Sequence, residues 1–155
     1  MRQKSVDLSR GLGISCALVA LSFSGCGGVY DASVDGTVTL DGNPINRGTV
    51  TYSPVQPGPT AYGEIDSSGG YYLRCGTEDG LPQGEYQVTV TAEEPPAAER
   101  SAAGGPPPSG KAITPVWYRM KDSSGLKYTV ESGSNTIDLK LTSTPPAGWR
   151  AAASR

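Results

Sequence analysis

The chain has 155 residues, enough for one domain, and it contains no histidine. Histidine is the usual general base and the commonest metal ligand, so its absence disfavours most acid–base and metal catalysis. Thirteen Lys and Arg residues stand against 15 Asp and Glu residues without a basic patch, which argues against a nucleic-acid partner.

Residues 1–25 are arranged like a bacterial export signal. Three basic residues within positions 1–10 precede an apolar run over 11–25 that is too short to cross a bilayer comfortably as a helix. The run ends in Phe23-Ser24-Gly25-Cys26, which resembles the bacterial lipobox, although that motif normally has Leu in place of Phe23. The resemblance implies that residues 1–25 are removed and that Cys26 carries the lipid. Without lipidation the chain would be secreted.

The expected mature chain is acidic and has no disulfide framework. Residues 1–25 contain three of the 13 basic and one of the 15 acidic side chains, so the remainder has a net charge of −4. Cys16 lies in the removed segment and Cys26 would be lipid-linked, which leaves Cys75 without a partner. Cys75 shares its alternation with Tyr71 and Leu73 and is therefore predicted to pack in the core. A reactive thiol is the alternative, but no histidine can activate it.

From residue 34 onward, hydrophobic alternation predicts strands separated by turns rich in Gly, Pro, Asn and Asp. The clearest strand is 85–92, in which Tyr86, Val88, Val90 and Ala92 share one face. Residues 66–70 are predicted to join two strands as a hairpin, and 133–135 are predicted to be a turn, with Asn135 as a turn residue. The predicted strands are 34–40, 49–52, 60–65, 71–75, 85–92, 126–131 and 136–141. Their number and spacing predict an all-β, antiparallel β-sandwich of about seven strands.

Two segments interrupt this pattern. Residues 93–111 are rich in Pro, Gly and Ala and lack an apolar period, which predicts a mobile insertion within one domain. Residues 112–120, which include Trp117 and Tyr118, are predicted to be an ordered crossover on the sheet. Residues 142–155 are predicted to be a loose tail, and residues 26–32 a tether to the membrane.

The predicted sandwich contains three sequence motifs whose order along the chain is informative. Residues 34–45 form an alternating strand that ends in Asp41-Gly42-Asn43-Pro44-Ile45, residues 66–71 fit Asp-x-x-Gly-x-Tyr, and residues 84–90 fit Gly-x-Tyr-x-Val-x-Val. In this order the motifs resemble carboxypeptidase-regulatory-like, transthyretin-like domains. The resemblance implies a β-sandwich over residues 33–141. It also implies an accessory role without catalysis, because these domains are mostly accessory modules.

Aromatic residues are the main candidates for ligand binding. Tyr72, Trp117 and Tyr118, with Tyr62 beside them, could form an exposed platform for a carbohydrate. Tyr72 is the best candidate for exposure because it opposes the inward alternation of Tyr71. The alternative is that these aromatics hold the crossover against the sheet.

The loop that begins at Asp66 has two interpretations. Its oxygen atoms could bind calcium, but it supplies a single carboxylate, and a turn in which Asp66 bonds nearby amides is the simpler explanation. The sequence therefore predicts no metal, no cofactor and no catalytic residue.

The sequence as a whole favours a non-catalytic, lipid-anchored envelope protein that acts as a structural, adhesive or binding module. Its expected partners are the membrane, through Cys26, and an envelope protein or polysaccharide. A carbohydrate- or peptide-binding lipoprotein is the alternative, and an enzyme is the least favoured.

Overall fold

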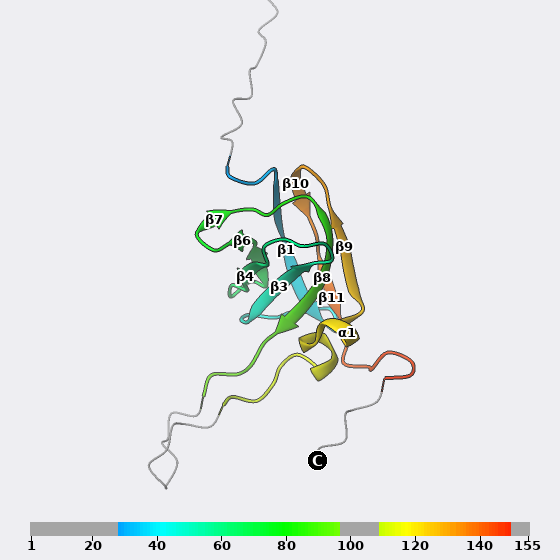
Figure 1. Ribbon diagram of the computed structural model, residues 1–155. Coiled ribbons are helices and arrows are strands. Elements are labelled where there is room, and N and C mark those ends of the chain that lie inside the picture. Colours follow the sequence, from blue (N-terminus) through cyan, green and yellow to red (C-terminus); the bar gives the residue numbers. More distant parts are fainter. Residues whose placement is uncertain (1–27, 97–108, 150–155) are drawn as a thin grey trace, which may run out of the picture.

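The computed structural model describes residues 28–96 and 109–149, and it confirms an all-β sandwich of two sheets (Figure 1). The predicted signal segment 1–25, Cys26, most of the predicted insertion and residues 150–155 lie outside the described residues. The two ends of the insertion lie side by side, because Glu94 N–H donates to the carbonyl of Lys111 at 2.8 Å.

The first sheet is built around strand β1 (Ala32–Leu40). It pairs antiparallel with β2 (Asn43–Pro44) and β5 (Gly70–Tyr72), and parallel with β10 (Gly133–Thr136) and β11 (Leu139–Leu141). The carbonyl of Val34 accepts from Leu73 N–H, and the carbonyl of Asp35 accepts from Ile137 N–H. Because successive carbonyls of a strand point to opposite edges, β5 and the β10–β11 segment flank β1 on opposite sides.

The second sheet is antiparallel throughout. It contains, in spatial order, β7 (Glu78–Asp79), β6 (Arg74–Cys75), β4 (Ala61–Glu64), β3 (Thr49–Pro54), β8 (Gly84–Thr91) and β9 (Leu126–Val130). The predicted inward face of residues 85–92 is confirmed, since all four of its apolar residues are buried. They pack against the buried face of β1, as the alternation of both strands requires.

The predicted hairpin across residues 66–70 is confirmed for β4 and β6, which pair antiparallel, and is wrong for β5. β5 pairs with β1 in the first sheet, whereas β4 and β6 are joined only through Tyr62 and Arg74 in the second. The chain therefore changes sheets within residues 70–75. Tyr71 and Leu73 are buried between the layers at this crossing, as their alternation predicts.

The predicted turn at 133–135 is also wrong, because these residues belong to β10, which runs parallel to β1. The physical reason that residues 133–135 join β10 is the set of hydrogen bonds made by the Asn135 side chain. Its Oδ1 accepts from Glu131 N–H at 3.0 Å and its Nδ2 donates to the Glu131 carbonyl at 2.8 Å, which closes the turn from outside. Its Nδ2 also donates to the carbonyl of Ser33 at 3.1 Å, which ties the segment to β1. The sandwich is thus antiparallel except at its last strands.

The predicted crossover, residues 112–120, is ordered and contains the single-turn 3₁₀ helix η1 (Val116–Arg119), and a second single-turn helix, α1 (Lys121–Ser124), follows it. The first part of the predicted loose tail is docked on the crossover, which corrects that prediction for residues 142–149. Thr142 N–H donates to the Tyr118 hydroxyl at 3.1 Å, and the ring of Trp149 meets the ring of Trp117 edge-on at 5.0 Å. Burial of these aromatic surfaces outweighs the ordering of a Pro- and Ala-rich segment.

Two buried tyrosine hydroxyls link the sheets. The Tyr71 hydroxyl donates to the carbonyl of Ile137 at 2.7 Å and lies 3.0 Å from the Tyr52 hydroxyl. Because a hydroxyl has one hydrogen, Tyr52 must donate to Tyr71. The chain of bonds therefore runs from β3, through β5, to the segment between β10 and β11.

This direction predicts unequal effects of removing the two hydroxyls. Tyr71→Phe leaves the Tyr52 donor and the Ile137 carbonyl without their partner, and we expect it to lower the free energy of unfolding by roughly 2–3 kcal/mol. Tyr52→Phe removes one bond and leaves only an acceptor lone pair on Tyr71, so we expect a loss of about 1 kcal/mol. Urea unfolding of the two variants measures the difference. Equal losses would contradict the assigned direction.

Candidate functional site

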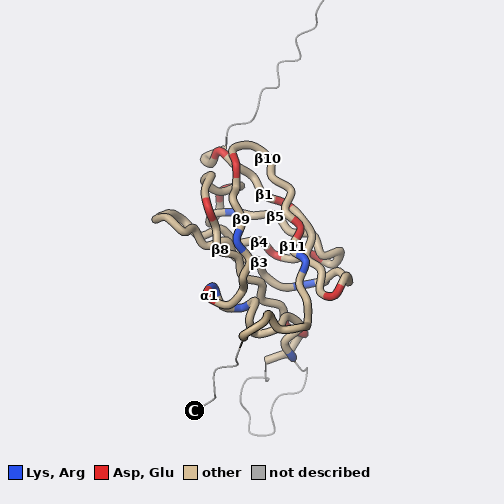
Figure 2. The backbone as a smooth tube through the Cα atoms, turned by 90° about the vertical axis from the view of Figure 1, so that its right-hand side faces the viewer, with Lys and Arg blue, Asp and Glu red and all other residues tan. Residues whose placement is uncertain are grey.

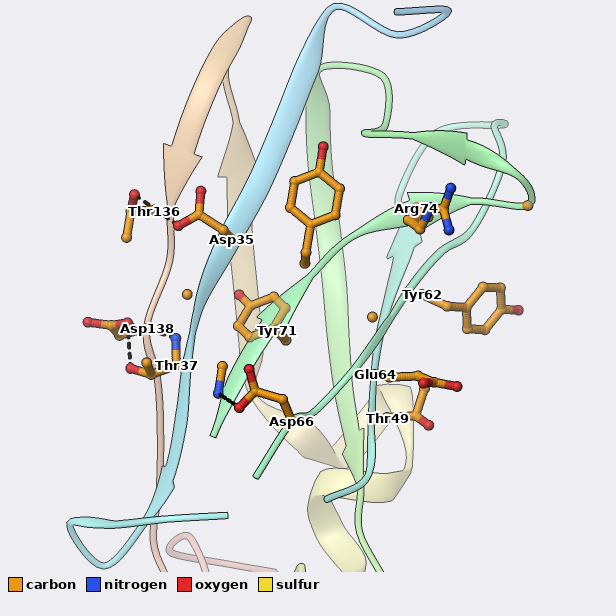
Figure 3. Close-up of a pocket in the computed structure, with 15 residues that line it drawn as sticks. Asp35, Thr37, Thr49, Tyr62, Glu64, Asp66, Tyr71, Arg74, Thr136 and Asp138 are labelled. Atoms are coloured by element: carbon orange, nitrogen blue, oxygen red, sulfur yellow. Dashed lines mark hydrogen bonds between the residues drawn. The ribbon is translucent and has the colours of Figure 1, made fainter. Parts of the chain in front are cut away.

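A groove of about 960 Å³ opens on the outside of the sandwich where β5 crosses between the sheets (Figure 3). Asp35 and Thr37 on β1 reach it because they alternate with the buried Val34 and Val38. On the opposite side, β4 presents exposed side chains that alternate with buried ones. The groove therefore has two walls, β1 with β10 and β4 with β6, and the close-up shows β5 passing between them.

Beside the groove, a glycine on β4 lies against the backbone of β5. A Cβ atom on Gly63 would lie 2.7 Å from the carbonyl oxygen of Tyr72, closer than real side-chain contacts. Glycine at this position therefore allows β4 to approach the backbone of β5.

The β1 wall holds two carboxylates. Asp138 Oδ1 accepts from Thr37 Oγ1 at 2.7 Å and from Thr37 N–H at 2.9 Å, where β10 ends and β11 has not begun. The pKa of Asp138 lies below its usual value. The bond from the Thr37 hydroxyl is the main cause, and the bond from the Thr37 N–H is the second. Asp35, the second carboxylate, has a long contact of 3.4 Å with the hydroxyl of Thr136.

Asp66 lies at the foot of the groove and organises its own turn. Its Oδ1 accepts from Ser68 Oγ at 2.6 Å, from Ser68 N–H at 2.7 Å and from Gly70 N–H at 3.0 Å. The bonds from Ser68 are the main reason that the pKa of Asp66 lies below its usual value. These contacts support the turn interpretation of this loop. Within residues 28–96 and 109–149, no group of three or more acidic or cysteine side chains could hold a metal ion.

The β4 wall carries Glu64, which is exposed, and β6 contributes Arg74. The Arg74 guanidinium bonds Asp79 at 2.8 Å and donates to the Thr77 carbonyl at 3.0 Å, so its charge is balanced outside the groove. Four carboxylates and this one cation line the groove, which gives it a negative potential. Figure 2 shows further acidic segments at the end of the molecule where the described chain begins.

The predicted aromatic platform does not assemble as one surface. Tyr72 is 42% exposed and lines the groove, where it is joined by Tyr62, which is 54% exposed. Trp117 and Tyr118 are only 8% and 7% exposed and belong to the hydrophobic core, as the packing interpretation states. Tyr62 faces outward on β4, where it alternates with the buried Ala61 and Gly63.

Cys75 and Cys26 are the two cysteines of the expected mature chain. Cys75 is buried in the core as a free thiol, and burial raises its pKa, which supports the packing interpretation. Cys26 lies outside the described residues, and its lipidation stays a prediction. Among the described residues, no helix has the length and apolar character needed to cross a bilayer.

Two of the four groove carboxylates, Asp66 and Asp138, are poorly suited to donating a proton. A general acid in carbohydrate hydrolysis needs a raised pKa. The carboxyl groups of Asp66 and Asp138 have lowered pKa values, so both stay ionised at neutral pH. This arrangement suits the binding of a ligand.

Comparison with known proteins identifies no relative: no protein-family model, no curated protein and no solved structure matches the chain. The resemblance to carboxypeptidase-regulatory-like domains therefore rests on the three motifs within residues 33–141.

Proposed function

We propose that the chain is a non-catalytic binding module held on the bacterial envelope by a lipid on Cys26. The observation that carries the binding role is the groove, which is open to solvent and lined by four carboxylates and two exposed tyrosines. A groove lined by one sign of charge attracts partners of the opposite charge, which supports a binding role. The resemblance of its motifs to accessory sandwich domains supports a role without catalysis.

The short segment before β1 supports a position close to the membrane. β1 begins at Ala32, six residues after Cys26. A fully extended stretch of this length spans at most about 20 Å. A lipid on Cys26 would therefore keep the end of the sandwich near residue 32 beside the bilayer, with the groove on its flank.

A carbohydrate-binding role is the second candidate, and the exposed tyrosines favour it. Ring faces such as those of Tyr62 and Tyr72 can pack against the apolar face of a sugar. Carboxylates such as Asp35 and Glu64 can accept hydrogen bonds from its hydroxyls. Binding of neutral oligosaccharides to the purified chain separates this candidate from the cationic partner argued below.

The anchor is tested by replacing Cys26 in bacterial cells. We expect the unaltered chain to be processed and to remain with the membrane fraction, and Cys26→Ser to lose the lipid and the membrane association. Metabolic labelling with a radioactive fatty acid, together with fractionation, measures both.

Cys16→Ser is the matched control, because it removes a cysteine from the segment that should be discarded. It should behave like the unaltered chain. Processing and membrane association of Cys26→Ser identical to those of the unaltered chain would rule out the anchor.

A further inference from the structure

The charge of the groove selects against anionic ligands. Asp66 and Asp138 are held as anions by bonds from hydroxyl and N–H groups, and the single lining cation, Arg74, is balanced by Asp79. This surface would repel a polyanion and attract an ammonium or guanidinium group. The groove is therefore complementary in charge to a basic partner.

Two further carboxylates remain open to such a partner, one on each wall. Asp35 makes only a long hydroxyl contact of 3.4 Å, and Glu64 is exposed on β4 (Figure 3). The exposed rings of Tyr62 and Tyr72 add faces on which a cation can also rest. Both walls thus offer an acceptor for positive charge, and the rings complete the contact surface.

An extended peptide fits this two-walled arrangement. Successive side chains of an extended chain point in opposite directions, so neighbouring residues would face the Asp35 wall and the Glu64 wall in turn. We propose that the groove binds an extended segment of a partner protein that carries Lys or Arg side chains.

This inference rests on the proposed binding role and is independent of the anchor at Cys26. The test uses the purified full chain and isothermal titration calorimetry with three probes. These are an octapeptide of two Lys-Lys-Gly-Gly repeats, which presents Lys to both walls, the matching peptide of Glu-Glu-Gly-Gly repeats, and a linear glucose hexasaccharide. We expect binding of the lysine peptide alone, with an affinity that falls as salt rises. Failure of the lysine peptide to bind, or binding of the hexasaccharide in its place, would overturn the proposal.

Two double variants test whether the lysine peptide binds in the groove. Asp35→Asn with Glu64→Gln should weaken the lysine peptide by about fivefold or more, at roughly twofold to fivefold for each exposed charge. Asp122→Asn with Glu85→Gln changes the net charge equally but lies outside the groove, and it should leave the affinity within about twofold. Equal weakening in both double variants would show attraction to overall charge and would overturn the assignment to the groove.

Folding and anchoring are controlled separately. All four substitutions are close in size to the native side chains and lie at solvent-accessible positions, and circular dichroism verifies that each variant is folded. Cys26→Ser should bind the lysine peptide as the unaltered chain does. Loss of membrane association with peptide binding retained would refute only the anchor. Membrane association without peptide binding would refute only the cationic ligand.

Discussion

The free energy of unfolding is expected to fall steeply above pH 10, because three buried tyrosines keep their protons only in the folded chain. Tyr52, Tyr71 and Tyr86 are each at most 5% exposed. Burial is the main cause that raises their pKa values, to about 12 for Tyr86 and further for the other two. In the unfolded chain their pKa returns to about 10.

The sign follows from where the proton is held. The folded state binds these protons more tightly, so their contribution is complete below pH 10 and is lost as the pH rises toward the folded pKa values. Each tyrosine that ionises only on unfolding contributes a slope of about 1.4 kcal/mol per pH unit. Three such tyrosines predict a loss of about 4 kcal/mol between pH 10.5 and 11.5. Urea unfolding followed by circular dichroism at a series of pH values measures it.

Two single substitutions separate this effect from general alkaline damage. Tyr71→Phe removes one buried ionisable group and should reduce the slope by about one third. Tyr62→Phe alters an exposed ring and should leave the slope unchanged. If Tyr71→Phe retains the full slope, buried tyrosines are not the origin of the alkaline loss.

Gly36→Ala is expected to lower the free energy of unfolding by about 3 kcal/mol or more. A Cβ atom at this position would overlap the carbonyl oxygen of Ile137 and lie 2.6 Å from its carbonyl carbon. Both atoms belong to the backbone, so the segment between β10 and β11 would have to move. That movement would break the bond from Tyr71 to Ile137 and would disturb the bond from Thr37 to Asp138. Denaturant unfolding measures the loss.

Gly58→Ala is the matched control, because a Cβ atom there would meet only ordinary contacts, at 3.6 Å or more. Its free energy of unfolding should stay within about 0.5 kcal/mol of the unaltered value. If both alanine variants are equally stable, the close approach at Gly36 does not constrain the first sheet.

Local patterns were sufficient for the strands and for part of the site. Residues 85–92 bury the four predicted side chains, and the opposition of Tyr72 to Tyr71 predicts that Tyr72 is exposed, as it is. These predictions succeed because side-chain alternation within a strand depends on residues two positions apart. The two short helices and the docking of Trp149 on Trp117 depend on contacts across the molecule.

The groove shows the limit of such patterns. Asp138 reaches Thr37 across 101 positions of the chain, and nothing local to either residue indicates that β10 and β11 run parallel to β1. The partner of a strand edge is decided by which buried surfaces meet and which backbone groups they leave to be paired. By itself the sequence determined an all-β chain, its strand faces and a predicted lipid attachment at Cys26. Only the tertiary structure decided which strands are neighbours, and hence that the acidic side chains of distant strands line one groove.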